Sequence, residues 1–150
     1  MGRNYLPCFG GASVLLLECK KLSSTAEYGV FMKVGSTILV IDDNEDFRKL
    51  LAETLIMWGY NAAEAVDGEH ALSIIEQFSP DLVIVDLDMP NMDGLEFTRR
   101  VKEINPNFPV IMVTAFARFY TSEEITASHP DAFLQKPVHM DKLLEVIQQM

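Results

Sequence analysis

The chain has 150 residues, of which 49% are apolar, and its 12 lysines and arginines against 22 aspartates and glutamates give a formal charge of −10. This length fits one globular domain with a real core and does not fit two full-sized domains. Residues 1–35 carry four basic and two acidic residues, a net +2, which leaves −12 for residues 36–150. Phosphate backbones would repel so acidic a body, which disfavours a direct nucleic-acid binder.

The first 35 residues differ from the rest of the chain. They hold both cysteines, Cys8 and Cys19, so the body has no internal disulfide and is compatible with a reducing compartment. No apolar run reaches the roughly 18 residues that a membrane span needs. We therefore expect a cytoplasmic protein with no membrane partner. Residues 1–35 are interpreted as an extension that is disordered or non-native, with Met32 as a candidate start, and residues 36–150 as the domain.

From Ser36 onward the chain alternates strand-like and helix-like segments. Short, continuously apolar runs rich in β-branched residues predict strands that are covered on both faces, because they are too short for buried helices. The signal is weaker for the second and the fifth run. The five predicted strands are Thr37–Ile41, Tyr60–Ala65, Leu82–Val85, Val110–Val113 and Ala132–Leu134.

Helical spacing of apolar residues fills the intervals between these strands. The periodic positions are Phe47, Leu50, Leu51 and Leu55; Ala71, Leu72, Ile75 and Phe78; and Met140, Leu143, Leu144 and Ile147. A third helix is expected from about Gly94 to Ile104, and Thr121 with Glu124 matches a capping box that opens a short fourth one. Strand and helix alternating five times predicts an α/β fold, a doubly wound five-stranded parallel sheet with helices on both faces.

Polar side chains follow four of the predicted strands. Asp42 and Asp43 come directly after the first strand and Asp86 after the third. Thr114 follows the fourth strand, and Lys136 stands two residues past the fifth. Because the carboxyl ends of parallel strands open at the same edge of a sheet, these side chains are expected to meet in one crevice.

Each of these residues also has an ordinary structural explanation. Asp43 or Asn44 could simply cap the helix that begins near Glu45. Asp86 could be a loop acid, and Lys136 a solvated cation. Such coincidences at four strand ends of one sheet are much rarer than any single one, so we favour a functional site.

A site with three carboxylates requires a compensating cation, because like charges repel one another. Oxygen ligands without His or Cys favour Mg²⁺, with Mn²⁺ as the alternative, over zinc. A metal, an ammonium and a hydroxyl around a carboxylate suit transfer of a phosphoryl group to that carboxylate, since the equatorial oxygens need neutralising partners. Asp86 is the natural acceptor, because it follows a central strand and precedes a turn that leaves it open.

Taken together, these motifs resemble the receiver domain of the two-component response-regulator family. The resemblance implies a flavodoxin-like fold and a signalling domain, not an enzyme, in which Asp86 takes a phosphoryl group from a partner phosphohistidine. It also implies that Asp42, Asp43 and Asp86 hold Mg²⁺ together with the backbone carbonyl of Asp88. The matching segments, within about Ser36 to Met150, are Asp42-Asp43, Asp86-Leu87-Asp88-Met89-Pro90-Asn91-Met92-Asp93-Gly94, Thr114-Ala115 and Lys136-Pro137.

The resemblance further implies how phosphorylation is sensed. Thr114 would bond one phosphoryl oxygen and Lys136 would pair with another. Phe133 would move when Thr114 is drawn toward the phosphate, and would carry the signal to the outer face of the fourth helix, fifth strand and fifth helix. A downstream protein target is expected on that face. The Lys136–Pro137 bond would be cis.

The phosphoryl donor must be another molecule, because no His in this sequence stands at metal-ligand or triad spacing from a carboxylate. The implied partner is a histidine kinase or a histidine phosphotransfer protein. The fifth predicted helix runs to Met150, so we expect either a stand-alone regulator or a truncated chain.

Some positions depart from the family pattern. Residues 128–131 replace a common Gly-Ala pair, which predicts a shortened fourth helix. Phe116 and the acid at Asp88 flank the path of a hydrolytic water and are expected to tune the lifetime of the phosphoryl group.

Two other functions fit parts of this sequence. Asp86-Leu87-Asp88 resembles the Asp-x-Asp of haloacid-dehalogenase-type phosphatases, in which Asp86 would be the nucleophile. That motif belongs on the first strand with the metal-binding acids late in the chain, and here the order is reversed. The second alternative is a flavodoxin-like interaction module that never takes up phosphate, and the five intact key positions argue against it.

Overall fold

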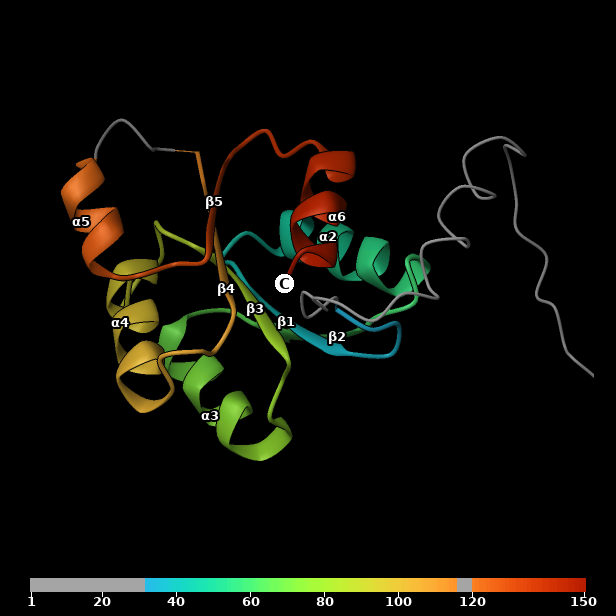
Figure 1. The fold of residues 1–150 in the computed structure, drawn as a ribbon, viewed down its shortest axis with the longest axis horizontal. Helices are drawn as coiled ribbons and strands as arrows, with labels where there is room; N and C mark the ends of the chain where they lie inside the picture. The colour runs from blue at the N-terminus through green and yellow to red at the C-terminus, as the bar shows by residue number, and fades with distance from the viewer. Residues whose placement is uncertain (1–31, 116–119) are drawn as a thin grey trace, which may run out of the picture.

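The computed structural model describes residues 32–115 and 120–150, which form a parallel sheet flanked by helices (Figure 1). The strand order is β2-β1-β3-β4-β5, so β2 lies on one side of β1, and β3, β4 and β5 follow on its other side. This order confirms the predicted doubly wound fold. The first strand has the predicted bounds, while the third, fourth and fifth each extend one residue further. The strands are β1 (Thr37–Ile41), β2 (Asn61–Ala65), β3 (Leu82–Asp86), β4 (Val110–Thr114) and β5 (Ala132–Gln135).

The helices begin at capping residues that the sequence supplies. Asn44, and not Asp43, caps the first described helix by accepting a hydrogen bond of 2.9 Å from the Phe47 amide. The predicted capping box of Thr121 and Glu124 is present. The helix that it opens is short, as predicted, and has six residues. The helices are α2 (Glu45–Met57), α3 (Gly68–Phe78), α4 (Gly94–Ile104), α5 (Ser122–Ala127) and α6 (Met140–Gln148).

The sheet separates two apolar cores, with α2 and α6 on one face and α3, α4 and α5 on the other (Figure 1). Burial on both faces explains why the central strands are continuously apolar and not alternating. The faces of β1, β3 and β4 are covered, and the polar side chains of these strands lie only at the strand ends. The first core includes Ile38, Val40, Ile84, Ile111, Leu51, Leu55, Leu143 and Ile147; the second includes Leu39, Val83, Val85, Met112, Ala71, Phe97 and Val101.

Residues 32–35 lead into β1 and contact the body. The Gly35 amide donates a hydrogen bond of 2.8 Å to the Gly59 carbonyl, and Met32 packs against the core beside α2 and α6. Most of the extension predicted at residues 1–35 lies outside the described residues, so its role stays a prediction. In the part of the chain that the structure describes, no helix has the length and apolar character to cross a membrane.

Gly94 is the first residue of α4 and lies against the end of β3. A Cβ at this position would lie 2.3 Å from the backbone oxygen of Asp86, so another residue would force two backbone segments apart. We expect Gly94→Ala to lower the free energy of unfolding by about 2–3 kcal/mol, as overpacking does.

The matched control is Gly68→Ala, at the first residue of α3. Its Cβ would meet the Met92 side chain at 2.8 Å from the sulfur, 2.9 Å from Cγ and 3.0 Å from Cβ, and no backbone atom as close, so rotation of the methionine can relieve most of the overlap. We expect this variant to lose less than about 1 kcal/mol. Urea unfolding of both variants measures the difference, and equal losses would show that the approach of α4 to β3 is not the constraint.

Candidate functional site

Three carboxylates meet at the carboxyl ends of β1 and β3, and we call them the acid cluster: Asp42, Asp43 and Asp86. One oxygen from each carboxylate lies within 4.8 Å of the other two. The side chains of Asp42 and Asp86 are buried, whereas Asp43 is exposed and opens the group to solvent. The structure therefore brings together the three acids that the sequence places at adjacent strand ends.

Lys136 forms ion pairs with the acid cluster. Its Nζ lies 2.6 Å from Asp42 Oδ2 and 3.4 Å from Asp86 Oδ1. The Phe47 ring, 4.2 Å from the same nitrogen, adds a cation–π contact. The peptide bond from Lys136 to Pro137 is cis, as predicted. A single ammonium, drawn mainly to Asp42, leaves the charge of three carboxylates incompletely balanced.

Asp86 is the member of the cluster with the least compensation. Its Oδ1 is buried and has no hydrogen-bond partner among the described residues. Burial raises the pKa of Asp86 to about 6; the Lys136 ammonium opposes this rise and the Asp42 carboxylate adds to it. The Lys136 ammonium thus balances the charge of ionised Asp86 only in part. A set of oxygen ligands only, in which the buried Asp86 Oδ1 accepts no hydrogen bond from a described residue, fits a hard divalent cation such as Mg²⁺.

Arg48 holds the backbone of the acid cluster from α2. Its buried guanidinium donates a hydrogen bond of 2.7 Å to the Asp42 carbonyl and one of 3.2 Å to the Glu64 carboxylate. The Asn44 cap fixes the residue at which α2 begins. This start brings the Phe47 ring to the Lys136 ammonium and the Arg48 guanidinium to the Asp42 carbonyl. Sequence reasoning assigned Phe47 to the helix core and missed Arg48, because a basic residue after an acidic pair has no distinctive local pattern.

Asp88 links two hydroxyl groups beside the acid cluster. Its Oδ2 accepts a hydrogen bond of 3.2 Å from Thr114, which is buried at the end of β4. Its Oδ1 accepts one of 2.7 Å from the Tyr120 hydroxyl. Burial and this bond raise the pKa of Tyr120. Sequence reasoning did not find Tyr120, since its partner lies 32 residues earlier in the chain. Phe116, the other residue expected to tune phosphoryl lifetime, lies outside the described residues.

Phe133 lies on the side of the sheet that α3, α4 and α5 cover. It pairs with Met112 across β4 and β5, whereas Thr114 pairs with Gln135. Met112 and Thr114 are two residues apart on one strand and therefore point to the same side. Phe133 is partly buried against the core there. The two predicted switch residues thus share a side of the sheet without being register partners.

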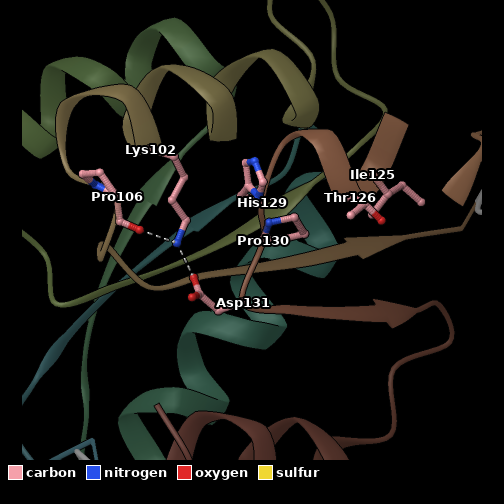
Figure 2. A pocket seen from close by; sticks show the side chains of 7 residues that line it. All are labelled: Lys102, Pro106, Ile125, Thr126, His129, Pro130 and Asp131. Atoms are coloured by element: carbon pink, nitrogen blue, oxygen red, sulfur yellow. Dashed lines mark hydrogen bonds and ion pairs between the residues drawn. The ribbon is translucent and has the colours of Figure 1, made fainter. Parts of the chain in front are cut away.

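A cavity of about 610 Å³ lies near α5, away from the acid cluster, and Figure 2 shows the residues that line it. Asp131 is one of these residues and accepts a hydrogen bond of 2.8 Å from the amide of Val110, the first residue of β4. The Lys102 ammonium reaches Asp131 at 2.7 Å and the Pro106 carbonyl at 3.3 Å, so its charge is paired. None of the predicted site residues lines this cavity: Pro106 and Asp131 precede β4 and β5, whereas the acid cluster lies at the carboxyl ends of the strands.

Comparison with known proteins identifies one family. The family model for the response regulator receiver domain matches residues 38–148 of this chain. The sensor histidine kinase RcsC of Escherichia coli K12 is 38% identical over 110 residues, which cover 73% of this chain and 12% of that protein. The transcriptional regulatory protein ZraR of Salmonella typhimurium is 35% identical over 111 residues, 74% of this chain and 25% of that protein. The chain thus spans a quarter or less of these curated relatives.

Solved structures show the same fold. The response regulator TrrA of Thermotoga maritima, in complex with Mg²⁺ and BeF, has a TM-score of 0.70 and 32% identity, covering 76% of this chain and 97% of that one. The chemotaxis protein CheY4 of Vibrio cholerae has a TM-score of 0.69 and 30% identity, covering 77% and 98%.

Proposed function

Because the chain belongs to the response-regulator receiver family, we propose that it is a signalling domain that accepts a phosphoryl group on Asp86 in a Mg²⁺-dependent reaction. The observation that carries this proposal is the buried Oδ1 of Asp86, which accepts no hydrogen bond from a described residue and has the Lys136 ammonium at 3.4 Å. The two nearby carboxylates of the acid cluster complete an oxygen donor set. The complex of TrrA with Mg²⁺ and BeF supports the same chemistry in a relative.

In the proposed reaction, a carboxylate oxygen of Asp86 attacks the phosphorus of a phosphohistidine. A P–O bond to Asp86 forms, the P–N bond breaks, and its electron pair stays on the imidazole. Lys136 would pair with one phosphoryl oxygen and the Thr114 hydroxyl would donate to another. Asp42, Asp43, Asp86 and the Asp88 carbonyl would hold Mg²⁺, which supplies positive charge to the phosphoryl oxygens when bound.

The proposed partners follow from the family. The donor is a histidine kinase or a histidine phosphotransfer protein, and RcsC is named as a sensor histidine kinase. The output is a protein target on the face made by α5, β5 and α6. The location of Thr114 and Phe133 on the side of the sheet that α5 covers supports this choice. The cytoplasmic location stays a prediction from the cysteine distribution.

Incubation with acetyl phosphate tests the proposal and its metal dependence. We expect intact-mass spectrometry to find one added phosphoryl group with MgCl₂, and its loss in hydroxylamine, as for an acyl phosphate. With excess EDTA we expect less than about 1% of this uptake, because uncompensated carboxylates repel an anionic donor. No adduct with Mg²⁺ would contradict the proposal. Sustained hydrolysis of p-nitrophenyl phosphate would instead favour a phosphatase of the haloacid-dehalogenase type.

A further inference from the structure

α5 is held loosely on the body. None of its residues is buried, and among them Ile125 is the one that packs, partly buried, against the core. The cavity of about 610 Å³ borders α5 at Ile125 and Thr126 (Figure 2). A second hollow of about 430 Å³ lies along Ser122 and Ala127. A helix with so little buried surface depends on a few contacts for its position.

Tyr120 supplies one such contact at the beginning of α5. It directly precedes Thr121, the N-cap of the helix. Its side chain is partly buried, and its hydroxyl donates a hydrogen bond of 2.7 Å to Asp88 Oδ1. Hydrogen bonds to an ionised carboxylate are shorter and stronger than those between neutral groups. This contact therefore ties the start of α5 to a residue two positions after Asp86.

The Asp88 carboxylate is shared with the proposed switch residue, because its Oδ2 accepts from Thr114 at 3.2 Å. A hydroxyl has a single proton to donate, so Thr114 must leave Asp88 in order to bond a phosphoryl oxygen on Asp86. A phosphoryl group also replaces the single negative charge of the Asp86 carboxylate with about −1.5 to −2, and this additional charge repels the Asp88 carboxylate. With the Thr114 bond to Oδ2 lost, this repulsion would move Asp88 away from the position in which Tyr120 reaches its Oδ1.

We propose that the hydrogen bond from Tyr120 to Asp88 tethers α5 in the unphosphorylated protein and that phosphorylation of Asp86 releases this tether. The release rests on the proposed function, whereas the tether itself does not. Tyr120 is a positioning residue, because it acts on α5 and does not touch the reacting carboxylate.

Amide hydrogen exchange, followed by NMR without metal, tests the tether at residues 125–129. We expect Tyr120→Phe to speed this exchange about tenfold, because it removes a hydrogen bond to a charged group. Tyr60→Phe is the matched control: Tyr60 is buried in the core beside α2 and α6, and no described residue bonds its hydroxyl. The control should stay within about twofold of the original protein. Unchanged exchange in Tyr120→Phe would overturn the tether.

A double-mutant cycle identifies the partner of Tyr120. Asp88→Ala should speed α5 exchange by the same factor as Tyr120→Phe, and the double variant should exchange no faster than either, since both remove one contact. The Ile84 and Ile111 amides, in the buried centre of the sheet, show whether each variant stays folded. Additive effects would mean that Tyr120 and Asp88 act on α5 separately, which would overturn the assignment.

The release is tested with Mg²⁺ and beryllofluoride, a mimic of the phosphoryl group. In the original protein we expect the probe to raise α5 exchange to the rate that Tyr120→Phe shows without metal. In Tyr120→Phe itself, we expect the probe to cause no further rise in α5 exchange. The Leu87 amide, next to Asp86, reports whether the probe binds. No shift there would refute the proposed function while leaving the metal-free comparison to decide the tether. A shift at Leu87 without faster α5 exchange would overturn the release.

Discussion

Asp86→Asn is expected to abolish phosphoryl uptake from acetyl phosphate, leaving less than about 1% of the original level. The amide of asparagine has nearly the size of the carboxylate but lacks its nucleophilic charge. The Lys136 ammonium pairs with Asp42 at 2.6 Å independently of Asp86, so we expect the rest of the site to remain assembled in this variant. Loss of uptake would therefore identify the acceptor and would not merely report a collapsed site.

The control for this result is Asp46→Asn, which removes an exposed acid from the first turn of α2. It changes the net charge by the same amount at a residue outside the acid cluster, and uptake should remain at the original level. Intact-mass spectrometry after equal incubation compares the three proteins. An adduct that survives Asp86→Asn and resists hydroxylamine would place the phosphoryl group on another residue and contradict the assignment of Asp86.

The same substitution should stabilise the metal-free protein at neutral pH. The pKa of Asp86 is raised from 3.8 to about 6 in the fold, mainly by burial, so ionising this carboxyl costs folding free energy. The full shift corresponds to about 3 kcal/mol, and rearrangement of water and side chains around the carboxylate reduces it to an expected 1–2 kcal/mol. Asp86→Asn removes this cost.

The pH dependence gives the sign of the effect. A carboxyl whose pKa is raised on folding stabilises the fold fully below its unfolded pKa, near 3.8, and this contribution is lost as the pH rises through about 6. Urea unfolding in EDTA should therefore show the advantage of Asp86→Asn growing from about pH 4 to about pH 7. Parallel stability curves would contradict the raised pKa. Added Mg²⁺ should stabilise the original protein more than the variant.

The sheet and the acid cluster were predictable because their signals are local. Continuous apolar runs define three of the five strands, β1, β3 and β4, and weaker patterns mark the other two. Asp42, Asp43, Asp86 and Thr114 follow or end strands whose carboxyl ends share one edge. A parallel arrangement then brings them together without any knowledge of side-chain contacts. The same rule predicts that Lys136 lies near the acid cluster. It does not predict that Lys136 lies closer to Asp42 than to Asp86, because that preference depends on differences of about an ångström.

Contacts between distant segments could not be predicted from the sequence. Arg48 bonds the Asp42 carbonyl because the α2 helix turns it toward β1, and Tyr120 meets Asp88 because two loops converge after different strands. Neither residue belongs to a periodic pattern or a motif. Gly94 is an intermediate case: its place in the matching segment was visible, but the reason for a glycine, the approach to the Asp86 carbonyl, required the fold.

The ion pair between Asp42 and Lys136 joins residues 94 positions apart, near the two ends of the folded region. During synthesis, the carboxylates of the acid cluster emerge from the ribosome well before Lys136 does. A nascent chain without β5 would have to gather like charges without their ammonium, which electrostatic repulsion opposes. The acid cluster therefore gains its ammonium only after β5, the last strand, has been made.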